Sequence, residues 1–132
     1  MKTLCVDFDG VLHSYASGWQ GPHIVADEPV PGAMAWLTEM VALGYDVQIY
    51  SARSSQSGGR EAMKAWLAKH LPVGAILPDE YELTNPELYI ETYIKFPVEK
   101  PSAWLTIDDR AICFRGTFPS ALEIDNFKPW NK

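Results

Sequence analysis

Two pairs of acidic residues are the first features of this sequence that could do chemistry. Asp7 and Asp9 stand two positions apart, directly after a short apolar run. Asp108 and Asp109 follow a later apolar run. Carboxylates that are brought together raise one another's pKa values unless a cation lies among them. Mg²⁺ prefers oxygen ligands, so the two pairs predict a magnesium site with all four aspartates as candidate ligands.

The same acids are suited to phosphoryl transfer. A carboxylate at the end of a rigid strand can act as a nucleophile, which is the role we expect for Asp7. Asp9 would be the general acid for the leaving group and then the base for water. Ser51 also follows an apolar run, and its hydroxyl could donate a hydrogen bond to a phosphoryl oxygen. A lysine would complete this catalytic set by neutralising the charge on the phosphoryl oxygens.

Two lysines are candidates for that role. Lys100 lies eight residues before Asp108 and is preferred, because Pro101 could begin a short helix that presents it near the end of a strand. Lys95 lies thirteen residues before Asp108 and could fill the same place or bind the substrate. The sequence leaves this choice open.

Alternating strands and helices must position these residues. Helical spacing of apolar residues predicts one helix from Pro31 to Gly44 and a second that contains Trp66. Short apolar runs predict strands at 3–8, 45–50, 73–77, 93–96 and 103–107. This alternation predicts an α/β domain with a mainly parallel sheet, in which ligands collect at the carboxyl ends of the strands.

The remaining segments carry weaker signals. Residues 13–32 are rich in Gly and Pro and predict a structured loop or flap of about 20 residues. Residues 78–91 hold five acidic residues and no basic one, which predicts a solvated irregular segment. The tail that ends at Trp130 is expected to pack its aromatic residues on the domain, with an exposed partner peptide as the alternative.

Composition limits the class of protein. The chain has 132 residues, with 11 Lys and Arg against 17 Asp and Glu, a net charge of −6, and this length suits a single domain spanning residues 1–132. The acidity argues against a broad non-specific grip on a nucleic-acid backbone. We find no membrane-spanning run or secretory signal, and we expect a cytoplasmic protein. Cys5 and Cys113 are expected to be reduced, buried thiols.

Four ordered motifs together resemble those of the haloacid dehalogenase-like (HAD) phosphohydrolases. They are Asp7-Phe-Asp9-Gly, Ile49-Tyr-Ser51, a lysine, and Ile107-Asp108-Asp109, and the resemblance covers residues 3 to about 115. It implies a Rossmann-like three-layer fold, an aspartyl-phosphate intermediate at Asp7 and acid–base work by Asp9. It also implies Mg²⁺ held by Asp7, the backbone carbonyl of Asp9, and Asp108. The dehalogenase branch lacks the second aspartate, so the resemblance implies phosphoryl transfer.

Within that family the chain is similar to small members without a cap domain. Ser51-x-Arg53, Trp66 and Arg110 resemble the phosphatase domain of phage-type polynucleotide kinases. This likeness implies that Arg53 is a ligand for the substrate phosphate and that the substrate is a nucleotide or a nucleic-acid end. The relatives carry a second functional arginine in the flap, where this chain has Trp19, and Trp19 or Tyr15 could instead stack on a base.

Other hypotheses about the substrate, the assembly and the class of protein stay open at this point. The substrate could be a sugar phosphate or another metabolite phosphate, and a second subunit could cover the site in a homo-oligomer. A receiver-like signalling domain also uses an aspartate nucleophile, a hydroxyl and a lysine, but it carries its acid pair and its nucleophile on different strands. A silent binding module would usually lack the nucleophile or the acid, and both Asp7 and Asp9 are present. His13 and His23 lie in the flap, where a structural role is the more common one.

Overall fold

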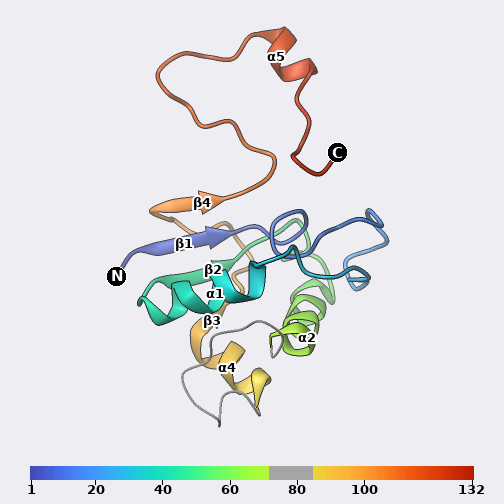
Figure 1. Ribbon diagram of the computed structural model, residues 1–132, viewed down its shortest axis with the longest axis vertical. Coiled ribbons are helices and arrows are strands. Elements are labelled where there is room, and N and C mark those ends of the chain that lie inside the picture. The colour runs from blue at the N-terminus through green and yellow to red at the C-terminus, as the bar shows by residue number, and fades with distance from the viewer. Residues whose placement is uncertain (72–84) are drawn as a thin grey trace.

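The chain forms an α/β domain around a parallel sheet. The computed structural model describes residues 1–71 and 85–132. In spatial order β3-β2-β1-β4, the strands of these residues are Ile94–Lys95, Asp46–Ile49, Thr3–Val6 and Leu105–Ile107 (Figure 1). Each neighbouring pair is parallel, which confirms the predicted fold class and sheet type.

Helices connect β1 to β2 and β2 to β3, and one further helix follows β4. The helices of the described residues are α1 Ala33–Ala42, α2 Gly59–His70, α4 Pro86–Tyr93 and α5 Ala121–Asp125. α1 contacts β2, α4 contacts β3, and α2 packs against α4. None of these helices is long and apolar enough to cross a membrane.

The core is densest around β1 and β2. Val6, Val47 and Ile49 have no exposed surface, and Leu37 of α1 and Leu67 of α2 are equally buried against the same cluster. Burying side chains of this size contributes about 1.5–3 kcal/mol each. β1 is therefore a rigid support for the loop that begins at Asp7.

From β4 onward, in contrast, the chain is largely exposed. β4 is an edge strand, and Leu105 within it keeps 47% of its surface exposed. Residues 108–132, which we call the C-terminal arm, leave the sheet and form an arch that carries α5 (Figure 1). The arm returns at its end, where the indole N–H of Trp130 donates to the carbonyl of Gly10 at 2.8 Å.

Two predicted segments differ from the structure. α1 begins at Ala33 instead of Pro31, because Gly32 adopts a left-handed conformation with φ 86 and stands before the first helical turn. The prediction of an irregular 78–91 segment was wrong for residues 86–91, which lie in α4. Asn85 accepts the Leu88 N–H at 3.2 Å, and this cap with Pro86 starts the helix despite the acidic composition. The predicted strand 73–77 and residues 78–84 lie outside the described residues.

Predictions about the arm also need correction. Cys5 is buried as predicted, but Cys113 is exposed, as are the other residues from Arg110 to Phe118. The tail aromatics are not buried either, since Trp130 keeps 65% of its surface exposed and touches the domain through its N–H. α5 was not predicted, although the Ser120 hydroxyl caps it by accepting the Glu123 N–H at 3.1 Å.

Candidate functional site

Three loops leave the sheet at one edge. Val6 is aligned with Ile49 on one side and with Ile107 on the other. The N–H of Asp7 continues the ladder by donating to the Ile107 carbonyl at 2.9 Å. Because the strands are parallel, the residues that follow them, including Asp7 and Asp108, begin at the same carboxyl edge.

Three of the four predicted metal ligands lie together at this edge. One carboxylate oxygen each from Asp7, Asp108 and Asp109 can be chosen so that all lie within 4.8 Å of one another. Burial is the main cause that raises the pKa of Asp7 to about 8, and the charges of Asp108 and Asp109 raise it further. A hydrogen bond from the Phe8 N–H acts in the other direction and lowers it. A group of oxygen ligands short of positive charge has the chemistry that suits Mg²⁺.

Gly10 allows the first loop to approach Asp109 closely. Its φ is 85, and a Cβ at this position would lie 2.8 Å from the Cγ of Asp109. Any other residue would be strained in its backbone and would displace that carboxylate. The glycine after Asp9 therefore permits the cluster to form.

Asp9 is turned to different partners. Its Oδ2 accepts from Nε of Arg53 at 2.9 Å, and its Oδ1 accepts from Nη2 of Arg53 at 3.1 Å. Nδ1 of His13 lies 2.8 Å from the same Oδ1. Burial alone would raise the pKa of Asp9, but the hydrogen bonds from His13 and Arg53 outweigh it and hold the pKa below its ordinary value. Asp9 therefore lies outside the side-chain cluster, next to donors that favour its charged form.

Arg53 does not fit the expected role of a ligand for the substrate phosphate. Its side chain has no exposed surface. Nη1 donates to the carbonyls of Gly21, Pro22 and Ile24 at 3.1, 3.0 and 2.9 Å. The guanidinium also lies 5.0 Å from the ring centre of Trp19. These contacts make Arg53 the residue that ties the 13–32 segment to Asp9.

Ser51 is held by the turn that follows β2. It is 4% exposed, and its N–H donates to the Ser54 hydroxyl at 3.0 Å. Its own hydroxyl oxygen accepts the Arg53 N–H at 3.2 Å. Because that contact uses the oxygen as an acceptor, the hydroxyl proton remains available for donation, as the expected role requires.

The two candidate lysines lie in different surroundings. Nζ of Lys95 lies 3.1 Å from Asp46, the first residue of β2, which is at the opposite end of that strand from Ser51. Lys95 is thus drawn away from the carboxyl edge. Lys100 is exposed, and its charge acts on the Cys5 thiol of β1, where it opposes the rise in pKa that burial causes. Among the described residues no helix begins at Pro101, so the predicted helix is wrong, but Lys100 remains the better candidate of the two.

Sequence reasoning missed the contact between His13 and Asp9. His13 is 1% exposed, stacks on Phe8 at 5.5 Å and meets the edge of Trp66 at 5.6 Å. The backbone N–H of His13 donates to the Phe8 carbonyl at 3.0 Å, and this bond closes residues 8–13 into a helix-like turn. The four-residue spacing between Asp9 and His13 is the signal that could have revealed the pair, since such spacing places side chains on one face of a turn.

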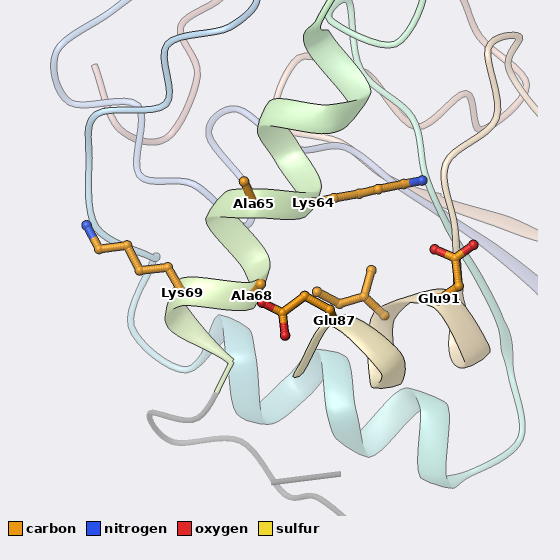
Figure 2. A pocket seen from close by; sticks show the side chains of 7 residues that line it. Lys64, Ala65, Ala68, Lys69, Glu87 and Glu91 are labelled. Carbon is orange, nitrogen blue, oxygen red and sulfur yellow. The ribbon is translucent and has the colours of Figure 1, made fainter. Parts of the chain in front are cut away.

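A cleft elsewhere on the molecule offers a second place for a ligand. It has a volume of about 520 Å³ and lies between α2 and α4, and Figure 2 shows its charged side chains. Its two lysines and two glutamates balance in charge, and none of the predicted site residues lines it. The cleft therefore gives no reason to move the candidate site from the sheet edge. It is lined by Lys64, Ala65, Ala68, Lys69, Glu87, Ile90 and Glu91.

Comparisons of the chain with models of protein families, with curated proteins and with solved structures returned no match.

Proposed function

We propose that this protein is a Mg²⁺-dependent phosphatase that hydrolyses phosphomonoesters through an aspartyl phosphate at Asp7. The observation that carries the proposal is the setting of Asp7, at the carboxyl end of a buried central strand with Asp108 and Asp109 beside it. In this proposal the domain is a Rossmann-like, three-layer HAD-type core. Residues 13–32 serve as its flap, and it has no cap domain.

The proposed metal site would use the carboxylates of the cluster. Asp7 and Asp108 would bind Mg²⁺ directly with the backbone carbonyl of Asp9, as the resemblance implies, and Asp109 would be a further ligand or would orient the others. The raised pKa of Asp7 supports this assignment, because a cation would replace the proton that the cluster otherwise retains. Bound Mg²⁺ would supply neutralising charge to the carboxylates and to the phosphoryl oxygens.

The proposed reaction divides into two displacements. Asp9 would take up a proton when the substrate binds. A carboxylate oxygen of Asp7 then attacks phosphorus, the bond from phosphorus to the leaving oxygen breaks, and Asp9 gives that oxygen its proton. Water then attacks the aspartyl phosphate and returns a proton to Asp9, and the bond from Asp7 to phosphorus breaks to release inorganic phosphate. Ser51 and Lys100 would hold the phosphoryl oxygens during both steps.

A nucleotide or a nucleic-acid end is the substrate class that we favour. Trp19 is 48% exposed, and the guanidinium of Arg53 lies 5.0 Å from its ring centre. An aromatic ring fixed in this way can stack on a base. This part of the proposal rests on the flap, which also makes it separable from the chemistry of Asp7.

Turnover of a generic substrate tests the chemistry. With Mg²⁺ present, the chain should release phosphate from p-nitrophenyl phosphate, and Asp7→Asn should lower kcat by about 10³-fold or more because the nucleophile is lost. Asp125→Asn, a change in the exposed α5, is the matched control and should keep full activity. Equal activity of Asp7→Asn and the unchanged chain would overturn the proposal.

A panel of substrates tests the rest. Nucleotides, sugar phosphates and oligonucleotides with 3′- or 5′-phosphates should rank with the nucleic-acid compounds first. A preference for sugar phosphates would refute the substrate class while leaving the chemistry intact. A stable phosphoaspartate without turnover would instead indicate a receiver-like signalling domain.

A further inference from the structure

The hydrogen bonds of Asp9 leave its two oxygens unequal. An ionised carboxylate has about four acceptor positions, two on each oxygen. Oδ1 lies within hydrogen-bond distance of His13 Nδ1 at 2.8 Å and of Arg53 Nη2 at 3.1 Å. Among the residues that the structure describes, Oδ2 accepts only from Arg53 Nε at 2.9 Å. The side chain of Asp9 is 15% exposed. Oδ2 is therefore the oxygen with capacity left for a further partner.

A backbone amide fixes the direction of the His13 contact. Nε2 of His13 accepts the N–H of Asp27 at 3.1 Å, and a ring nitrogen that accepts carries no proton. In the neutral ring the proton then lies on Nδ1, so His13 donates to Asp9. The ring is also held on both sides, by Phe8 at 5.5 Å and by Trp66 at 5.6 Å.

We propose that His13 and Arg53 are positioning residues. They fill the acceptor positions of Oδ1 of Asp9 and one position of Oδ2, and the remaining position of Oδ2 exchanges the proton with the leaving group and with water. This inference rests on the proposed phosphatase function. Neither residue needs to touch the substrate, since both act through Asp9. Apart from Asp9, the side-chain hydrogen bonds of both residues within the described part of the chain go to the 13–32 segment, namely to the N–H of Asp27 and the carbonyls of Gly21, Pro22 and Ile24. The same segment that we assign to substrate selection thus sets the orientation of the general acid.

Two amide substitutions of His13 separate its two hydrogen bonds. The side-chain N–H₂ of Asn reaches the position of Nδ1, so His13→Asn can still donate to Asp9. The amide of Gln reaches the position of Nε2, so His13→Gln can still accept from Asp27 but offers Asp9 no donor. Both variants lose the ring that packs on Phe8 and Trp66, which makes each the control for the other in stability.

The kinetic readout is the dependence on the leaving group. We compare kcat/KM for phenyl phosphate, which has a poor leaving group, with kcat/KM for p-nitrophenyl phosphate, which needs little protonation. Misplacing Asp9 should lower the phenyl phosphate value about 10- to 100-fold in His13→Gln and the p-nitrophenyl phosphate value about threefold. His13→Asn should stay within about threefold of the unchanged chain on both substrates.

Each outcome has a distinct meaning. Equal losses on the two substrates, or equal behaviour of the Asn and Gln variants, would show that His13 is only structural and would overturn the inference. Failure of the unchanged chain to hydrolyse either ester would instead overturn the proposed function. If neither variant folds, ¹⁵N NMR of the unchanged chain decides the matter, because a His13 ring protonated at Nε2 and not at Nδ1 contradicts the inference.

Discussion

The two sides of the candidate site are held in opposite ways. On one side, the carboxylate of Asp9 has the donors of Arg53 and His13 within 3.1 Å. On the other side, Asp7 lies beside Asp108 and Asp109, whose charges add to the effect of burial in raising its pKa, and Asp108 is exposed. The first side is neutralised by the protein itself, whereas the second needs a proton or a cation.

The supporting chain differs in the same way. Asp9 and Arg53 follow the two buried central strands, and Trp66 of α2 donates to the Asp27 carbonyl at 2.8 Å, which ties the 13–32 segment to the core. Asp108 and Asp109 follow the exposed edge strand β4 and lead into the C-terminal arm. We therefore expect changes on the Asp9 side to affect stability strongly and changes on the arm to affect it little.

The largest effect is expected from Arg53→Met. The change leaves the Asp9 carboxylate and three carbonyls of the 13–32 segment without their shared donor. Removing one partner of a buried ion pair costs about 3–5 kcal/mol, and we expect a loss of that size in the free energy of unfolding in urea. Arg110→Met, on the exposed side, is the matched control and should change stability by less than about 0.5 kcal/mol. Similar losses in both variants would refute the contrast between the two sides.

The next effect concerns pH. Because the folded chain raises the pKa of Asp7 from 3.8 to about 8, it binds this proton more tightly than the unfolded chain does. The contribution of Asp7 to stability is thus complete below about pH 4 and is lost as the pH rises to about 8. The Tm of the metal-free protein should fall from about pH 5 to about pH 8, whereas Asp7→Asn should be nearly flat over that range.

Addition of Mg²⁺ should reduce this dependence of the Tm on pH. A cation that binds only the folded chain stabilises it, and it binds best where Asp7 is ionised. The rise in Tm on adding Mg²⁺ should therefore be greater at pH 8 than at pH 5. A rise of the same size at both values, or no rise at all, would contradict the assignment of the cluster as a metal site.

The smallest effect is expected at the end of the arm. Trp130→Phe removes the indole donor to the Gly10 carbonyl and leaves a ring that was already 65% exposed. The loss of one such hydrogen bond should cost about 0.5–1.5 kcal/mol in urea unfolding. Phe118→Leu, at a side chain that is 87% exposed on the same arm, should have a smaller effect, and a larger one would show that the arm is packed in solution.

The acidic cluster was predictable because it depends on chain order alone. Asp7 and Asp108 directly follow strands, and parallel strands bring such residues to one edge whatever the details of packing. The partners of Arg53 could not be predicted, for the opposite reason. The resemblance implied contact with the substrate phosphate, whereas the partners of Arg53 in the 13–32 segment lie about 30 positions away in the sequence. No local pattern reports such a contact.

The start of α4 and the exposure of Cys113 differ in whether the sequence could show them. The composition of 78–91 indicated a loop, yet the Asn85-Pro86 start signal for α4 was present in the sequence. Apolar residues such as Cys113 suggested burial, but Cys113 and its neighbours in the arm are exposed. A helix N-cap depends on neighbouring residues and can be predicted from the sequence. Burial of a side chain requires a partner surface that only the whole fold supplies.

By itself, the sequence determined the α/β class, the parallel sheet and the meeting of Asp7 with the Asp108–Asp109 pair. Those features follow from the alternation of apolar runs and from the order of residues along the chain. Only the tertiary structure decided that Asp9 pairs with Arg53 and that the arm stays exposed. Such outcomes depend on which donors and surfaces come within a few ångströms after the chain has folded, and spacing along the sequence does not encode that distance.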